Sequence, residues 1–167
     1  CECEWWFIKY FLGCDSFLPE SDELVKEYCG MKTIDTIQIG NSASFTKTVT
    51  ETDIILYAGI SGDFNPAHID SEHAKDSMFG QRIAHGMLSA AFISNVLGTQ
   101  LPGPGTIYMS QELRFVKPVY VGDTVTATAT VTQKITEKNR LILDTVVTNQ
   151  RGEKVITGTA TVMPPKG

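Results

Sequence analysis

The second half of the chain is dominated by segments in which hydrophobic and polar residues alternate. In segment 124–132 one face is wholly apolar and the other consists of threonines; the apolar face holds Val125, Ala127, Ala129 and Val131. This period of two is typical of a β-strand with one buried face. With a shorter alternating segment before residue 50, the pattern predicts an antiparallel sheet of about five strands, at 45–49, 107–116, 124–133, 141–148 and 154–163.

The region between the first and second of these strands predicts helices. Thr50 and Asp53 have the spacing of a capping box, and Gly62 can end the helix that they begin. Asp70 is placed to cap a shorter helix that runs to Ser77.

Segment 84–97 is the longest helical candidate, and Gly98 with the prolines and glycines at 102–105 is expected to end it. Small or apolar residues occupy nearly every side of this segment, which is typical of a buried helix. The apolar face of the predicted sheet needs a cover, and this helix is the natural one. We therefore expect an α+β fold in which the sheet wraps around a buried central helix.

One short segment, SGDFNPAHID at 61–70, concentrates the residues that can perform chemistry. Asp63 and His68 lie five positions apart, so in one continuous helix they would be separated by a rotation of roughly 500°. Pro66 excludes an interior helical position and biases Asn65 towards an extended conformation. A helix, a turn and a returning segment would let both side chains reach one water. Such a pair is an acid/base device that needs neither a metal nor a covalent nucleophile.

This segment and its surroundings resemble the MaoC-like family of (R)-specific enoyl-CoA hydratases, of the hydratase 2 type, which have the hot-dog fold. The residues that carry the resemblance are Tyr57, Ser61, Gly62, Asp63, Asn65, Pro66, His68, Ala74 and the IAHGM run at 83–87. The resemblance extends over about residues 31–163. It implies the addition of water to a trans-2-enoyl-CoA to give an (R)-3-hydroxyacyl-CoA, and the reverse dehydration, with no cofactor beyond the coenzyme A of the substrate.

The resemblance also implies a role for individual residues. Asp63 is expected to orient and activate the water, and His68 to share that water and supply or relay the proton to C2. The backbone N–H of Gly86, at the start of the buried helix, is expected to stabilise the thioester oxyanion. Asn65 is expected to shape the loop and to bond the catalytic carboxylate, and Ser94 to hydrogen-bond within the site.

Each of these residues also has a purely structural interpretation. Asp63 can form an Asx turn with Asn65, and His68 can be a buried histidine with satisfied hydrogen bonds. Gly86 can serve helix–sheet packing, and Ser94 can bond a carbonyl of the preceding helical turn. The sequence leaves these alternatives open.

Other residues complete the expected site. His85 is either a third polar group there or, as we favour, a structural residue that orients the helix start. The apolar side chains expected to line an acyl pocket, unless they belong to the core, are Phe64, Met87, Leu88 and Leu97. The histidines lack the spacing of a zinc motif, so no metal site is expected. Arg82 and Lys117 can reach the phosphates of coenzyme A, although exposure to solvent explains them equally well.

Composition divides the 167-residue chain into two parts. Residues 1–30 hold seven acidic and two basic residues and all four cysteines, whereas residues 31–167 hold twelve of each charge. We expect 31–167 to be a single domain and 1–30 to be an extension that is either non-native or loosely attached, with a packed segment or an interaction arm as alternatives. The net charge of −5 argues against a nucleic-acid partner. The apolar run at 5–12 is too short to span a bilayer, and a domain without cysteine fits a cytoplasmic location.

Two other functions compete with hydration. A hot-dog thioesterase would use a carboxylate to drive water onto the thioester carbonyl. A non-catalytic acyl-binding module would not need the Asp63–His68 pair. The resemblance also implies a homodimer or a higher homo-oligomer, and the expected partner is an acyl-CoA with no membrane involved.

Overall fold

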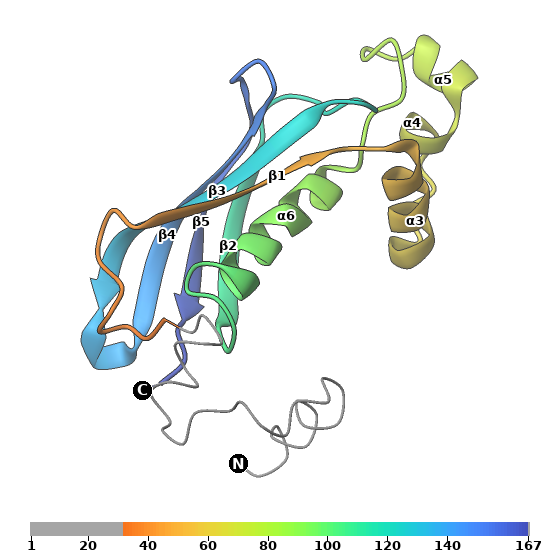
Figure 1. The fold of residues 1–167 in the computed structure, drawn as a ribbon. Coiled ribbons are helices and arrows are strands. Elements are labelled where there is room, and N and C mark those ends of the chain that lie inside the picture. The colour runs from red at the N-terminus through yellow and green to blue at the C-terminus, as the bar shows by residue number, and fades with distance from the viewer. Residues whose placement is uncertain (1–31, 167) are drawn as a thin grey trace, which may run out of the picture.

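The computed structural model describes residues 32–166, in which five strands form one antiparallel sheet (Figure 1). The strands are β1 (Ser42–Thr48), β2 (Ile107–Phe115), β3 (Thr124–Ile135), β4 (Arg140–Asn149) and β5 (Lys154–Met163). Their order in the sheet is β1-β3-β4-β5-β2, so that β1 and β2 form its two edges. The predicted five strands are therefore confirmed, with ends that differ by a few residues.

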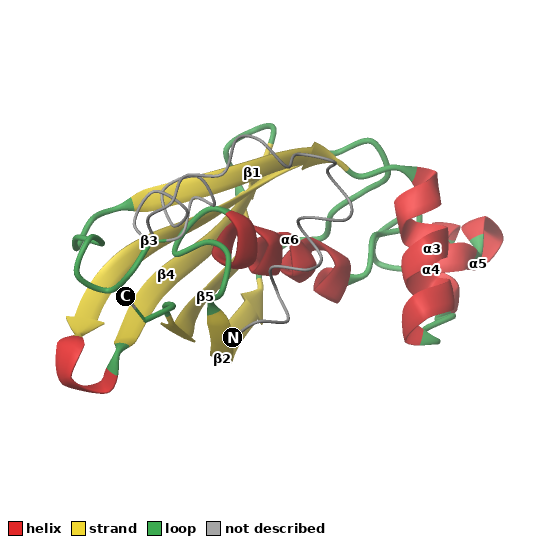
Figure 2. Cartoon of the chain, turned by 60° about the horizontal axis from the view of Figure 1, so that its bottom comes forward, coloured by secondary structure: helices red, strands yellow, loops and turns green. Residues whose placement is uncertain are grey.

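Helix α6 (Gly86–Thr99) lies against one face of this sheet and is the central helix of the fold (Figure 2). Its residues Ile93, Val96 and Leu97 are buried in the same core as the alternating apolar residues of the strands. In β3 every second residue from Val125 to Val131 is buried, as the alternation predicts. The α+β architecture with a sheet wrapped around a buried helix is confirmed.

The expected end of the central helix was wrong in one respect. Gly98 lies inside α6 rather than after it, although glycine in a helix interior costs about 1 kcal/mol relative to alanine. The helix continues because Val96 and Leu97 are fully buried and the N–H of Gln100 bonds the carbonyl of Val96. Tertiary packing therefore overrides the local preference of Gly98.

Three short helices lie together beyond one end of the sheet (Figure 1): α3 (Glu51–Ser61), α4 (Pro66–Ile69) and α5 (Ser71–Lys75). The predicted capping box of α3 is present, because Thr50 Oγ1 accepts from the N–H of Asp53 and the carboxylate of Asp53 accepts from the N–H of Thr50. Gly62 ends α3 with a φ of 75°, a conformation that favours glycine. Asp70 caps α5, which is two residues shorter than predicted.

The prediction for the N-terminal segment 1–30 lies outside the described residues, so its loose attachment stays a prediction. Within residues 32–166, no helix is both long enough and apolar enough to cross a bilayer.

Candidate active site

The turn between α3 and α4 brings Asp63 and His68 to one end of the central helix. Gly62 reverses the chain after α3, and Asp63 Oδ1 then accepts a hydrogen bond of 3.2 Å from the N–H of Asn65. Asn65 Oδ1 in turn accepts from the N–H of Ala67 at 3.1 Å and caps α4. The expected loop-shaping role of Asn65 thus has a structural basis. The Asx turn occupies only Oδ1 of Asp63, so that Oδ2 can still hold a water.

His68 lies on α4 with its ring partly buried. Its Nδ1 lies 2.8 Å from the carbonyl oxygen of Ile83, and the N–H of Ile83 bonds the carbonyl of Ala67 at 3.1 Å. These two bonds fasten α4 to the segment that leads into α6. The orientation of the His68 ring is therefore fixed by backbone groups on both sides.

His85 precedes the first residue of α6 and belongs to the same group of side chains. Its Nε2 lies 2.9 Å from the carbonyl oxygen of Asp63, and its ring stacks on that of His68 with centroids 3.8 Å apart. Tyr57, the aromatic residue of the signature, contacts the His85 ring at 4.9 Å between centroids. His85 thus contacts both candidate catalytic residues. Its side chain makes no capping bond to α6, so its expected role in orienting the helix start stays a prediction.

The polar atoms of this group are spaced for a shared water. One carboxylate oxygen or ring nitrogen from each of Asp63, His68 and His85 lies within 4.8 Å of the other two. Two groups that each bond one water at about 2.8 Å are about 4.5 Å apart when the water is tetrahedral. Asp63 and His68 can therefore bond the same water, although Asp63 is exposed in the chain by itself.

Gly86 is the first residue of α6, where the N–H has no partner within the helix and the helix dipole favours negative charge. A Cβ at this position would lie 2.7 Å from Cε1 of Phe115, so a larger residue would require the Phe115 ring, which is more than half exposed, to move. Both interpretations of Gly86 therefore have support: the close contact explains the missing side chain, and the helix terminus supplies the free N–H.

A cavity of about 450 Å³ opens beside these residues. It is lined by residues 83–87 and 115–119 together with His68, Met78, Phe79, Ser89 and Ile156. Most of the lining is apolar, with the two imidazoles and the N-terminus of α6 among the polar groups. This is the composition of a site that accepts an apolar ligand and fixes its polar end.

The residues expected to line an acyl pocket are scattered. Met87 lines the cavity, whereas Phe64 is exposed and lies outside it. Leu88 and Leu97 are buried in the hydrophobic core, the default alternative for both. Ser94 is exposed and does not line this cavity either. The expected role of Ser94 in the site therefore has no support from this chain alone, and the same holds for the expected pocket roles of Phe64, Leu88 and Leu97.

Ser89 was missed from the sequence. It is buried and lines the cavity, and its Oγ has no hydrogen-bond partner among the described residues. It follows His85 by four residues, a spacing that places both side chains on one face of a helix. This four-residue spacing in the sequence could have identified Ser89 as a candidate site residue.

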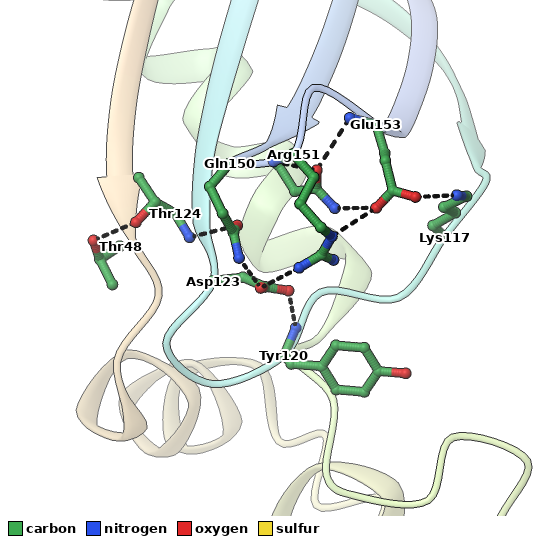
Figure 3. Close-up of polar contacts among 9 residues, drawn as sticks. Thr48, Lys117, Tyr120, Asp123, Thr124, Gln150, Arg151 and Glu153 are labelled. Atoms are coloured by element: carbon green, nitrogen blue, oxygen red, sulfur yellow. Dashed lines mark hydrogen bonds and ion pairs between the residues drawn. The ribbon is translucent and has the colours of Figure 1, made fainter.

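Both basic residues near the site are held by carboxylates. Lys117 lines the cavity, and its Nζ lies 2.6 Å from Glu153 at the edge of a polar network (Figure 3). Arg82 makes two bonds of 2.6 and 2.7 Å to Glu51, which lower the pKa of that carboxyl and raise the pKa of the guanidinium. A phosphate that approached either cation would compete with the carboxylate already bound to it.

The chain is similar to known hydratases both in sequence and in structure. The chain is 52% identical to the (R)-specific enoyl-CoA hydratase of Rhodospirillum rubrum over 87% of this chain and 96% of that protein. It is 40% identical to the (R)-specific enoyl-CoA hydratase of Aeromonas caviae, over 77% of this chain and 96% of that one. Among solved structures, the R-hydratase PhaJ1 of Pseudomonas aeruginosa, in its unliganded form, is 44% identical. It superimposes with a TM-score of 0.77, covering 81% of this chain and 86% of that one.

The family model matches most of the chain and nearly all of the site. The MaoC like domain matches residues 36–154, which include the turn with Asp63 and His68, the start of α6 and the cavity-lining segment after β2. The chain therefore belongs to the family of proteins with a MaoC-like domain.

Proposed function

We propose that this chain is an (R)-specific enoyl-CoA hydratase, which adds water to a trans-2-enoyl-CoA to give an (R)-3-hydroxyacyl-CoA and catalyses the reverse dehydration. The observation that carries the proposal is the spacing of the Asp63 carboxylate and the His68 ring, which suits one shared water, beside an apolar cavity. The high identity to the hydratases of R. rubrum and A. caviae supports it.

The proposed reaction begins with a water bonded by Asp63 and His68. The carbonyl of Ile83 can only accept a hydrogen bond, so His68 Nδ1 carries hydrogen and Nε2 offers its lone pair. As the water oxygen bonds C3, the Asp63–His68 pair takes one proton from it. The pair returns a proton to C2, so that both residues end the cycle as they began it.

Electrons of the C2–C3 double bond move towards the thioester oxygen during attack. We propose that the N–H of Gly86 stabilises this negative charge, because it stands at the positive end of a fourteen-residue helix. Every step is assigned to the protein's own groups, so the proposed reaction uses no cofactor apart from the coenzyme A of its substrate.

We propose that the chain acts as a homodimer that completes the binding site. β2 is an edge strand, and several of its apolar side chains are exposed: Ile107, Tyr108, Met109 and Phe115. Met87, which lines the cavity, is also more than half exposed. Exposed apolar groups on a sheet edge are typical of surfaces that another chain covers. A cytoplasmic location is our proposal from composition alone.

The test is an assay with crotonyl-CoA. Hydration removes the absorbance of the conjugated enoyl thioester without releasing thiol, and chiral analysis identifies the 3-hydroxybutyryl-CoA that forms. We expect the (R) product. Release of free coenzyme A would instead support the thioesterase, a predominantly (S) product would remove the stereochemical assignment, and binding without any reaction would support the non-catalytic module.

A further inference from the structure

The cavity beside the proposed catalytic pair has an exposed mouth and a buried floor. Met87 and Phe115, which line it, are each more than half exposed, whereas Ser89 and Ile156 are buried. Lys117 lies on the exposed side, because its side chain is 49% exposed. Among the described residues that line the cavity, it is the only lysine, arginine or carboxylic acid. A negatively charged group at the mouth therefore meets this cation.

The surroundings of Lys117 carry more positive than negative charge on the surface. The N–H of Lys117 bonds a backbone carbonyl of β5 at 3.4 Å, which places the residue beside the start of that strand. Two further cations at this start, Arg151 and Lys154, are exposed. The nearby carboxylates are Glu153, which is partly exposed, and Asp123, which is buried. Residues 31–167 as a whole hold equal numbers of both charges, so the positive excess is local.

One ion pair holds Lys117 in place, and this pair can be exchanged. Glu153 lies between Lys117 and Arg151 (Figure 3). Its carboxylate accepts bonds of 2.6 Å from Lys117 Nζ, 3.0 Å from Arg151 Nε and 2.8 Å from Asn149 Nδ2. When Lys117 leaves, Glu153 keeps the other two donors. Because ion pairs at the surface contribute little to stability, this exchange costs little.

Arg82, the other cation near the site, lacks these features. Its side chain is only 19% exposed, and two of its nitrogens bond Glu51 at 2.6 and 2.7 Å. It does not line the cavity. An anion would have to replace a two-point ion pair to bind Arg82, but only a one-point pair to bind Lys117.

We propose that Lys117 binds a phosphate group of coenzyme A, and that Glu153 and this phosphate compete for it. This inference rests on the proposed function, in which the thioester lies at Gly86 inside the cavity and the rest of the coenzyme A leaves through the mouth. The ammonium group of lysine suits a phosphate because it is a compact charge with three donors on a flexible stem. Glu153 keeps Lys117 at the mouth in the free enzyme and weakens the binding of substrate.

The test compares crotonyl-CoA with crotonyl-pantetheine, which has the same reacting group and arm but no phosphate. Lys117→Gln should raise the KM for crotonyl-CoA about 3- to 10-fold, as expected for a partly exposed charge pair. The kcat, and the KM for crotonyl-pantetheine, should not change. Lys117→Arg keeps the charge and should restore most of the affinity. Glu153→Gln should lower the KM for crotonyl-CoA, because it removes the competing carboxylate.

Lys138→Gln is the matched control, because it removes the same charge from an exposed residue in the turn between β3 and β4. Glu153 bonds Asn149 at the other end of β4, a strand of ten residues. Ten residues of strand span about 30 Å, which is several Debye lengths at physiological salt. Lys138→Gln should therefore leave the KM for both thioesters unchanged.

An unchanged KM for crotonyl-CoA in Lys117→Gln that is folded by circular dichroism, or an equal rise for both thioesters, would overturn the phosphate site. If Lys117→Gln does not fold, Glu153→Gln decides, and a KM for crotonyl-CoA that it does not lower would overturn the site. Calorimetric titration with coenzyme A requires no reaction. Weaker binding of coenzyme A to Lys117→Gln, without hydration by the unchanged chain, would refute the proposed function and keep the site. Hydration with a KM that does not depend on Lys117 would do the reverse.

Discussion

The imidazole rings of His68 and His85 stack with their centroids 3.8 Å apart, although His68 lies on α4 and His85 directly precedes α6. His85 also donates Nε2–H to the carbonyl of Asp63. One buried side chain therefore contacts both members of the proposed catalytic pair, through its ring face on one side and its N–H on the other. We infer that His85 is a positioning residue, which holds the turn and the His68 ring in register.

Replacing His85 by phenylalanine keeps an aromatic ring for stacking and removes the N–H that holds Asp63. We expect kcat to fall about 10- to 100-fold with little change in KM, because small displacements of reacting groups have costs of this size. His85→Gln keeps a donor without the ring and should recover part of the loss if the hydrogen bond is the main contribution. Steady-state assays with crotonyl-CoA measure kcat and KM of both variants, and His73→Phe, at an exposed position, is the control. Unchanged kcat in folded His85→Phe would contradict the role.

The proposed catalytic pair makes a stronger prediction. Asp63→Asn and His68→Gln should each lower kcat at least ~10²-fold, the lower end for a positioned acid/base group. Because both act on one water, the double variant should be about as slow as the slower single variant. Treatment with EDTA should not lower the activity of the unmodified chain. If both single variants stay folded by circular dichroism and keep more than about a third of kcat, the two residues only shape the loop.

The sequence predicts local structure better than the site. The caps at Thr50, Gly62 and Asp70 depend on neighbouring residues, and the structure has all three. The alternation in β3 was sufficient to identify its buried face because the period of a strand is fixed. The Asp63–His68 turn was predictable for the same reason, since Asn65 and Pro66 are local signals.

The parts that could not be predicted depend on contacts between distant segments. The contacts of His85 with Asp63 and of Phe115 with Gly86 join residues more than twenty positions apart. No period or cap in the sequence indicates that residues 115–119 line the cavity. Lys117 is exposed, as expected, but no local pattern indicates its ion pair with Glu153, which lies 36 positions away.

The N-terminal segment gives a prediction about domain limits. A chain that starts at Met31 should fold and retain hydratase activity, because the MaoC-like match begins at residue 36 and the described residues contain a hydrophobic core of their own. Thermal unfolding and the crotonyl-CoA assay compare it with the full chain. An insoluble or inactive shortened chain, beside an active full chain, would show that residues 1–30 are part of the working enzyme.

The proposed dimer can be tested at the exposed edge of the sheet. Met109→Lys places a charge on β2, where apolar side chains are exposed, and should weaken the dimer at least tenfold as measured by analytical ultracentrifugation. Ile39→Lys is the matched control, because Ile39 is an exposed apolar residue before β1, the opposite edge. A full chain that sediments as a monomer, or equal weakening by both variants, would contradict an interface at β2.

The polar network around Glu153 predicts how stability depends on pH (Figure 3). Hydrogen bonds from Asn149, Lys117 and Arg151 lower the pKa of Glu153 from its ordinary value to about 2. A folded-state pKa below the unfolded one means that the charged form stabilises the fold. This stabilisation is fully present above the unfolded pKa, near pH ~4.5, and is lost as the pH falls towards 2.

We therefore expect the free energy of unfolding of Glu153→Gln to lie below that of the unchanged chain at pH 6. The difference should shrink between pH 4.5 and 2, because protonation then removes the charge from the unchanged chain as well. Urea titrations at several pH values measure this difference in the free energy of unfolding.

Other carboxylates with lowered pKa values, such as Glu51 and Asp53, make both proteins less stable in acid, so only the difference between the two proteins is informative. Glu137→Gln, in an exposed turn, is the control. A difference that stays constant from pH 6 to 2 would mean that the bonds to Glu153 do not favour its charged form.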